Sequence, residues 1–493
     1  MATIYDYYEQ TQLSLAAYAL NLLQGMSGSS QTATYINDLT NAGMTPQQAA
    51  DFANTYTVLA QYSDALTGFS ATLFENTATG QKCFAIGGTV KVLPDLLADA
   101  AIAFGNPLFD LQIPDMVNFY NQLKTEGLIA PTDSLTVTGH SSGGYLAQLL
   151  TILDPTQISE TYTYNAPGFA DASALAVSLL QKIDTNITGV DPASLIVNIQ
   201  GGGPNVIAGL GNLVGGEQTI FTAGTSHKIE SLSDSLAVYN FFSELDPTLN
   251  NVTTGITTIT DILEASSYLA ANSLDSTITA LGILFHAPTT VISVNTGGDF
   301  YKSLDDLRTA LSQYDISVGP AIQPNYNFTI SDLTTLDANQ IASDAQNTLG
   351  YRYALVNLNP FAVTGNDAIY TQFDASGQLD VYNPATGKGA LTTQYLQDRA
   401  AMLAVQIQYN IGDSSSNLSG NIFYKDAATY NVLNTGNGNL TIDALQHIEF
   451  GADGAILNGG SLGDRLYAGT GNETIKGVSI ALNLEQPCHV AHV

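Results

Sequence analysis

Positively charged side chains are scarce in this chain of 493 residues. Lysine and arginine together number 13, against 44 aspartates and glutamates, so the formal net charge is −31 at neutral pH. Proteins that bind nucleic acid or an anionic membrane by electrostatic attraction carry the opposite sign. The composition therefore argues against both kinds of partner, and it fits a protein that works in a salty or calcium-containing medium.

Cysteines and long apolar runs are also scarce. The two cysteines, Cys83 and Cys488, lie far apart in sequence and do not make a disulfide framework. We expect Cys83, in an apolar strand-like run, to be a small buried hydrophobe rather than a reactive thiol. No apolar run reaches the roughly 20 residues of a membrane-spanning helix, so we expect no transmembrane segment. The first residues show neither the basic nor the apolar region of a Sec signal peptide.

Apolar residues make up 45% of the chain, which is enough for real cores, and the length predicts two or three domains. Helical spacing of apolar residues predicts helices within 1–65 and at 114–127, with a further helix near 93–104. Thr45 followed by Pro46 is typical of a helix start. Strands are expected in a hairpin over 69–87 and then at 134–138, 161–165 and 194–200. Strands that alternate with helices predict a mostly parallel α/β sheet.

The composition changes along the second half of the chain. Residues after about 245 are rich in Thr, Ser, Asn and Asp, and those after about 400 are rich in Gly, Asn and Asp. We therefore predict an α/β domain at 1–245, a cap or accessory α+β region at 246–400 and a β-rich region at 401–493. Amphipathic spacing over 253–285 predicts a helical cap.

Two glycine-rich turns stand nine residues apart near the C-terminal end. Asp464 and Glu473 occupy equivalent places in them, as do Leu466 and Ile475. This is the pattern of a parallel β-roll, in which glycine turns bind calcium and the aliphatic residue points inward. We expect a short β-roll-like repeat at 459–477, with structural calcium at Asp464.

The stretch 134–150 carries the clearest chemical signal. A β-branched strand leads into Gly-His-Ser-Ser-Gly at 139–143, and an apolar helix follows. The G-x-S-x-G pattern places Ser141 on a strained strand-to-helix turn, where glycines let the flanking chain pass close by. The helix N-terminus supplies backbone N–H groups for an oxyanion. Ser142 is a rival nucleophile, but the residue two positions before it is His140 rather than glycine, so we predict Ser141.

A serine nucleophile needs a base. His227 is the one histidine that follows the turn within the predicted α/β domain, and it fits the chain order serine, acid, histidine. His140 lies inside the turn, and we expect it to point away from the hydroxyl of Ser141. The remaining histidines lie beyond the α/β region: His286, His447, His489 and His492.

Several residues are candidates for the acid of the triad. Catalytic residues of an open α/β sheet lie at the carboxyl ends of its strands. Asp171 follows the strand at 161–165 and is the first candidate. Asn205, in the glycine-rich loop after the next strand, is the second, and Asp191, which precedes that strand, is the third.

The oxyanion hole needs two donors. One is expected from the backbone N–H of Ser142, the residue after the nucleophile. The other is expected from the loop over 84–89, where Thr89 offers both a backbone N–H and a hydroxyl.

The segments 137–144, 85–89 and 164–167 resemble the class 3 (fungal-type) lipase family of the α/β-hydrolases. This resemblance covers about 60–245, and the wider chain is similar to bacterial lipases with an RTX calcium-binding repeat tail. The resemblance implies ester hydrolysis through an acyl-enzyme, with Ser141 as nucleophile, His227 as base and Thr89 in the oxyanion hole. It also implies secretion, because such relatives are usually exported by a type I system. The family usually has leucine at position 142 and arginine at position 87, and its acid usually follows the strand that ends here at 201–205.

We therefore expect a serine esterase or lipase that acts on an ester or lipid substrate and needs no cofactor for catalysis. The predicted cap, or the loop over 104–114, would form an apolar acyl site and a lid, while an open cleft would accept polyesters. A phospholipase or an amidase could use the same residues. The alternative from another class is a non-catalytic α/β-hydrolase scaffold that acts as a calcium-dependent surface binding module.

Overall fold

The computed structural model describes most of the chain in thirteen segments: residues 2–88, 107–169, 190–202, 211–224, 227–286, 300–317, 323–412, 422–429, 431–434, 446–452, 454–459, 464–469 and 474–476. The predicted helix near 93–104 lies outside them. The chain divides into two compact units. Unit 1 comprises Met1–Ser243, Leu249–Ile256 and Ile292–Asp305, and unit 2 comprises Glu244–Thr248, Thr257–Val291 and Asp306–Val493. The three-part division at 245 and 400 stays a prediction.

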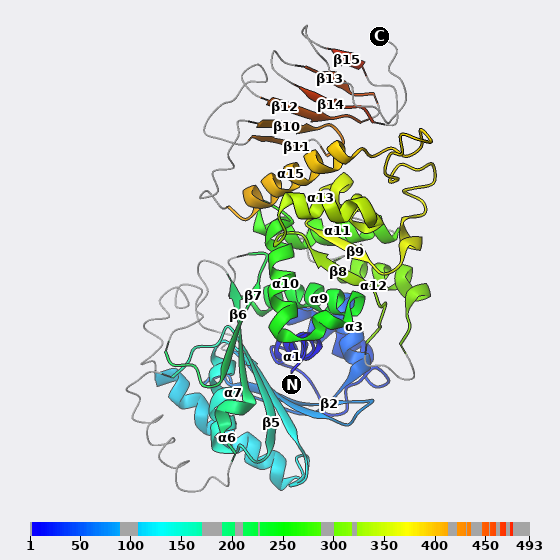
Figure 1. Ribbon diagram of the computed structural model, residues 1–493. Coiled ribbons are helices and arrows are strands. Elements are labelled where there is room, and N and C mark those ends of the chain that lie inside the picture. Colours follow the sequence, from blue (N-terminus) through cyan, green and yellow to red (C-terminus); the bar gives the residue numbers. More distant parts are fainter. Residues whose placement is uncertain are drawn as a thin grey trace. The chain divides into compact units, whose positions relative to one another are not determined.

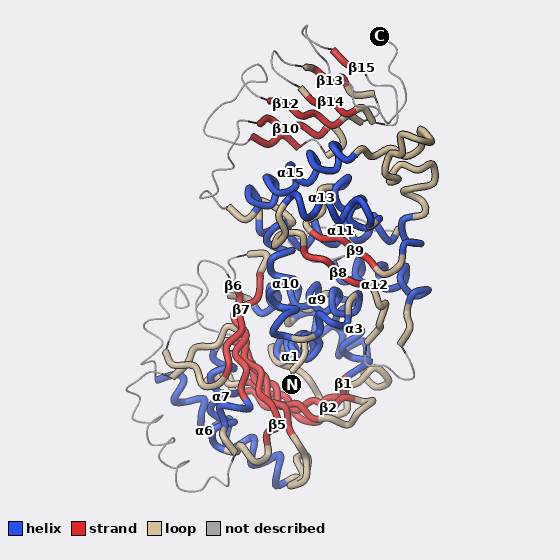
Figure 2. Tube along the Cα trace, viewed as in Figure 1, coloured by secondary structure: helices blue, strands red, loops and turns tan. Residues whose placement is uncertain are grey.

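Unit 1 is built on a seven-stranded sheet whose strands follow the order of the sequence (Figure 1, Figure 2). The strands are β1 (Tyr56–Ser63), β2 (Ser70–Asn76), β3 (Lys82–Gly87), β4 (Leu135–His140), β5 (Ile158–Tyr164), β6 (Ile196–Gly202) and β7 (Gly216–Phe221). Strand β2 is antiparallel to both of its neighbours, and β3 to β7 are parallel. This confirms a mostly parallel α/β sheet. Because every strand except β2 runs the same way, their carboxyl ends meet at one edge, called here the carboxyl edge.

Helices cover both faces of this sheet (Figure 1). The helices of this region are α1 (Ile4–Ala16), α2 (Thr32–Asn41), α3 (Pro46–Thr55), α6 (Pro107–Thr125), α7 (Ser142–Leu153), α9 (Ile229–Leu245) and the short η1 (Pro192–Leu195). Alternation along β4 explains the two faces. Val137 joins the core beneath α7, whereas the hydroxyl of Thr138 reaches the backbone of Gln10 in α1.

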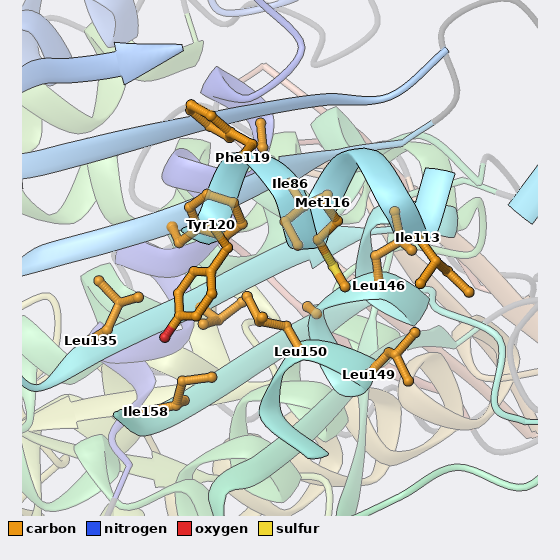
Figure 3. Packing of buried hydrophobic residues seen from close by; sticks show 14 of the residues in the cluster. Ile86, Ile113, Met116, Phe119, Tyr120, Leu135, Leu146, Leu149, Leu150 and Ile158 are labelled. Atoms are coloured by element: carbon orange, nitrogen blue, oxygen red, sulfur yellow. The ribbon is translucent and has the colours of Figure 1, made fainter. Parts of the chain in front are cut away.

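The core between the sheet and helices α6 and α7 is tightly filled (Figure 3). Phe119 and Tyr120 of α6 and Leu146 and Leu150 of α7 pack with Ile86 of β3, and all five are at most 4% exposed. Burying such side chains contributes about 1.5–3 kcal/mol each. This core fixes α7 against β4, and with it the turn that joins them.

The predicted hairpin and helix start are confirmed, with two corrections elsewhere. Strands β2 and β3 form the hairpin, and Thr45 caps α3 in a capping box with Gln48. The helical prediction for 1–65 is wrong at its end, because Tyr56–Ser63 form β1. Half of those eight residues are β-branched or aromatic, and the segment pairs with β2. The helix predicted at 114–127 begins at Pro107, so Pro114 lies inside it.

Most residues of the segment 252–285 are helical, as the amphipathic spacing predicts. They form α10 (Val252–Ala265) and α11 (Ala270–Phe285). The later helices are α12 (Phe300–Leu311), α13 (Ala338–Asn347), α14 (Leu349–Asn357) and α15 (Thr393–Asn410), with short turns at η2 (Pro247–Asn250), η4 (Ser312–Tyr314) and η5 (Asp367–Tyr370). Strands β8 (Thr329–Asp332) and β9 (Phe361–Thr364) form an antiparallel pair.

The C-terminal part of unit 2 is rich in short strands. One sheet holds β11 (Asn431–Asn434), β10 (Ile422–Asp426), β12 (Gln446–Phe450) and β14 (Arg465–Tyr467), in that order, and a second pairs β13 (Ile456–Asn458) with β15 (Thr474–Lys476). Successive strands from β12 to β15 thus alternate between two sheets. Leu457 and Leu466, nine residues apart, are both buried. The glycine turns at 460–463 and 470–473 lie outside the described residues, so the RTX interpretation stays a prediction.

Candidate active site

The turn between β4 and α7 holds Ser141 in a strained conformation. Every residue of β4 is buried, and Ser141 follows it with φ of 56° and ψ of −125°. Such a conformation costs an L-residue about 1–3 kcal/mol and persists only where its surroundings enforce it. Here the N–H of Ser141 donates to the carbonyl of Tyr164 at 2.9 Å, and its carbonyl accepts from the N–H of Gly144 at 3.0 Å.

Three glycines around the serine are required by close contacts. A Cβ on Gly139 would lie 2.4 Å from the carbonyl carbon of Gly143, and one on Gly143 would lie 2.3 Å from the carbonyl oxygen of Ile86. A Cβ on Gly144 would lie 2.5 Å from the Cβ of Ala166. The glycines thus bring the helix N-terminus close against β3, β4 and β5, as the G-x-S-x-G pattern predicts.

His227 reaches the nucleophile from the segment between β7 and α9. Its Nε2 lies 2.9 Å from Oγ of Ser141, which is hydrogen-bond distance. Burial lowers the pKa of His227 to about 4, so the ring is neutral at pH 7 and can accept the proton of Ser141. With Nε2 as acceptor, Nδ1 carries the hydrogen. Nδ1 is buried, and no acceptor from the described residues reaches it.

The sequence candidates for the acid have different outcomes. Asp171 and Asn205 lie outside the described residues. Asp191 is exposed and caps η1, accepting a hydrogen bond from the N–H of Ala193 at 3.0 Å. It precedes β6, whereas Ser141 follows the parallel β4, so the two stand at opposite edges of the sheet. The structure therefore does not bring Asp191 to Ser141 and His227.

Of the two predicted oxyanion donors, the structure describes Ser142 and does not describe Thr89. Ser142 is the first residue of α7 and is 4% exposed. Its backbone N–H belongs to the first helical turn, whose N–H groups point out of the helix end beside Ser141. His227 bonds to Ser141 rather than to this rival serine. Thr89 lies outside the described residues, which end on this loop at Gly88.

Asn165 is a site residue that sequence reasoning missed. It follows β5 with a φ of 45°, and it is 1% exposed. Its side-chain oxygen accepts the N–H of Gly201 at 2.8 Å, while its own N–H donates to Ile199. Asn165 therefore ties together the ends of β5 and β6. An asparagine at a strand end is the available signal, because asparagine tolerates positive φ.

His140 makes contacts that no sequence pattern indicates. Its Nδ1 lies 2.6 Å from the hydroxyl of Tyr18, and its Nε2 lies 2.7 Å from the carbonyl oxygen of His227. Alternation along β4 puts His140 on the same face as Thr138, toward α1. The partner, Tyr18, stands 122 residues earlier in the chain. Both ring nitrogens of His140 are thus engaged away from the hydroxyl of Ser141.

The predicted calcium ligand Asp464 lies directly before β14. Its Oδ1 stands 3.8 Å from Nδ1 of His447, which is fully buried. Calcium takes six to eight oxygen ligands, and the described residues contain no group of three or more acidic, histidine or cysteine side chains able to hold a metal ion. The glycine turns of the repeat lie outside the described residues, so the structural calcium stays a prediction.

Among the described residues, no helix is both long enough and apolar enough to cross a bilayer.

Comparison with known proteins gives distant likenesses. No protein-family model matches the chain, and no curated protein matches it. Among solved structures it is similar to the Lip2 lipase of Yarrowia lipolytica, with 18% identity and a TM-score of 0.29 over 43% of this chain and 77% of that one. It is also similar to lipase II of Rhizopus niveus, with 15% identity and a TM-score of 0.28 over 41% of this chain and 73% of that one. A triacylglycerol lipase of Penicillium expansum shows 14% identity and a TM-score of 0.25 over 47% of this chain and 86% of that one. These neighbours are lipases at low identity over less than half of this chain.

Proposed function

We propose that this protein is a serine hydrolase that cleaves carboxylic esters through an acyl-enzyme on Ser141. The observation that carries the proposal is the 2.9 Å contact between Oγ of Ser141 and Nε2 of a neutral His227. A serine on a strained turn, with a histidine nitrogen at hydrogen-bond distance, is the arrangement of an activated nucleophile.

The proposed reaction has two halves. His227 takes the proton of the Ser141 hydroxyl as Oγ attacks the ester carbonyl, and the backbone N–H of Ser142, together with Thr89, stabilises the oxyanion. His227 then gives this proton to the departing alcohol, which leaves an acyl-enzyme. In the second half, water loses a proton to His227 and attacks the acyl group, which releases the acid and restores Ser141. The proposed steps use side chains and backbone groups of the chain and no cofactor.

We propose Asp171 as the group that accepts the hydrogen of His227 Nδ1. A buried N–H without an acceptor costs about 1–3 kcal/mol, and Nδ1 of His227 has none among the described residues. Asp171 follows β5, whose carboxyl end lies beside Ser141. Asn205, after β6, is the second candidate.

Exposed leucines favour an ester with an apolar group. In the described part of unit 1, three large apolar side chains are exposed: Leu20, Leu23 and Leu66, at 42%, 57% and 91%. Leu66 lies in the turn directly after β1, at the carboxyl edge. Leu20 and Leu23 lie in the loop after α1. The side-chain amide of Gln61, near the end of β1, donates to the carbonyl of Ala19 in this loop at 2.6 Å. Leu66 and Leu20 thus lie near the carboxyl end of β1, whereas the loop that holds Leu23 continues along β1, where Gly25 donates to Val58. A lipid or an apolar polyester is the substrate class we propose. The proposal keeps the secreted location that the resemblance implies and the structural calcium that the glycine-rich repeat predicts.

Hydrolysis of p-nitrophenyl esters from acetate to palmitate tests the proposal. We expect the wild-type protein to be active and the Ser141→Ala variant to lose activity by roughly 10⁴-fold or more. The matched control is Ser194→Ala, because Ser194 is exposed on η1 at the opposite edge of the sheet.

The same assay separates an enzyme from a binding module. A wild-type protein that hydrolyses no ester of any chain length and shows no labelling of Ser141 by a fluorophosphonate probe would overturn the proposal. That result would favour the non-catalytic scaffold. Labelling without ester hydrolysis would instead point to an amide or a phospholipid as the substrate.

A further inference from the structure

We propose that Tyr18 is a positioning residue, which fixes the tautomer of His140 and through it the place of the catalytic base His227. The inference rests on the proposed function, and it adds a residue from the N-terminal segment to the machinery. Two hydrogen bonds connect Tyr18, His140 and His227 in a line.

The direction of each bond follows from the chemistry of its ends. The carbonyl oxygen of His227 can only accept, so the Nε2 of His140, 2.7 Å away, must carry a hydrogen. Burial lowers the pKa of His140 to about 3, so the ring is neutral and its Nδ1 is an acceptor. The hydroxyl of Tyr18, 2.6 Å from Nδ1, must therefore donate. Burial raises the pKa of Tyr18 above its ordinary value, so this hydroxyl keeps its proton.

The Tyr18 oxygen also lies against the backbone of Gly88. The approach is close, because a Cβ on Gly88 would lie 2.3 Å from that oxygen and 3.0 Å from the carbonyl oxygen of His140. Gly88 directly precedes Thr89, the proposed oxyanion residue. Tyr18 thus touches both the loop that leads to the oxyanion donor and the histidine that holds the base.

The geometry of His140 explains why its tautomer matters for the base. Its ring centroid lies 4.8 Å from that of His227, and the two rings are inclined at 40°. His140 is the last residue of β4, directly precedes Ser141 and is 5% exposed. The hydrogen bond from His140 to the backbone carbonyl of His227 therefore holds the imidazole of His227 beside the hydroxyl of Ser141. With the other tautomer, a lone pair of Nε2 would face the carbonyl oxygen, and the two would repel.

Replacing the tyrosine hydroxyl alone is the test. We expect Tyr18→Phe to lower kcat for a p-nitrophenyl ester by between about 10-fold and 100-fold, because a small displacement of a catalytic group costs that much. KM should stay within about twofold, because substrate binding is unchanged. The rate of fluorophosphonate labelling at Ser141 should fall with kcat.

The matched control is Tyr120→Phe. Tyr120 lies in unit 1, and its hydroxyl donates to Asp154 at 3.1 Å, so the variant loses a bond of the same kind away from Ser141. It should keep its kcat. If Tyr18 has a merely structural role, Tyr18→Phe will behave like Tyr120→Phe: the melting temperature will fall and kcat of the folded protein will stay unchanged. That result would overturn the inference.

A second readout needs no variant of Tyr18. Imidazole spectra of nitrogen-15 histidine in the wild-type protein should show His140, assigned by its absence in His140→Gln, with the hydrogen on Nε2. A hydrogen on Nδ1, or a doubly protonated ring, would overturn the inference even if Tyr18→Phe does not fold. A wild-type protein whose Ser141 is not labelled by the fluorophosphonate probe would instead refute the proposed function.

Discussion

At the scale of single residues, the conformation of Ser141 lowers the stability of the fold and serves the proposed reaction. Ser141 adopts a φ of 56°, which glycine would adopt without strain and serine does not. A serine at this position costs about 1–3 kcal/mol, and the three neighbouring glycines add flexibility to the unfolded chain. Strain concentrated on one nucleophile is typical of active sites. The energy that maintains it comes from the buried residues of β4 and from the packing of α7 beneath it.

The identity of the acid can be tested through the pH dependence of activity. A carboxylate beside Nδ1 of His227 favours the charged ring and raises its pKa, whereas burial alone lowers this pKa to about 4. The base must be neutral, so activity is lost as the pH falls through its pKa. We expect Asp171→Asn to reduce kcat by roughly 10³–10⁴-fold and to move the acid limb of its residual activity to lower pH.

Asp191→Asn is the control for this variant, because asparagine caps a helix about as well as aspartate and Asp191 is distant from Ser141. It should leave kcat and the acid limb in place. An Asp171→Asn variant with a normal kcat would exclude Asp171 as the acid, and Asn205→Ala would then be the variant to measure.

At the scale of elements, local signals predicted what local sequence determines. Alternating β-branched residues and the glycine-flanked serine were enough for β4, the turn and α7, because each depends on neighbours within a few positions. Strand β1 was missed, since its pairing with β2 decided between strand and helix. Tyr18 was missed for the same reason, as it meets His140 only after the sheet and α1 have packed. Asp171 could not be separated from Asn205, because the sequence does not say which loop folds toward His227.

The β-rich tail gives a prediction about one element. Strands β12 to β15 are three to five residues long, and short strands of this kind need an additional source of stability. If the glycine turns supply carbonyl oxygens beside Asp464, calcium is that source. We expect a chelator to lower the melting temperature of the tail and added calcium to restore it.

The Asp464→Asn variant is the companion measurement, since it should show the lower melting temperature with or without calcium. Magnesium at equal concentration controls for ionic strength. A melting temperature that responds to neither chelator nor calcium would show that the tail is a roll without a bound ion.

At the scale of the whole molecule, each unit has its own buried interactions. Arg399, on α15 in unit 2, is 1% exposed and pairs with the equally buried Asp426 at 3.0 Å. Its Nε donates to the carbonyl of Leu355 at 2.9 Å, and its guanidinium lies 4.6 Å from the ring centroid of Phe450. All four residues belong to unit 2. The groups proposed for ester hydrolysis all belong to unit 1, so stability and chemistry can be separated by substitution.

Arg399→Met should therefore destabilise unit 2 and leave the chemistry of unit 1 intact. Removing one partner of a buried pair leaves an uncompensated charge on Asp426, which costs about 3–5 kcal/mol. We expect calorimetry to show a lower melting temperature for unit 2, with unchanged labelling of Ser141 at temperatures where the variant is folded. Lys388→Met, at an exposed position of unit 2, removes a positive charge without this loss and is the control. If the folded Arg399→Met protein lost its labelling, the active site of unit 1 would depend on unit 2, and the two units would have to be treated as one catalytic body.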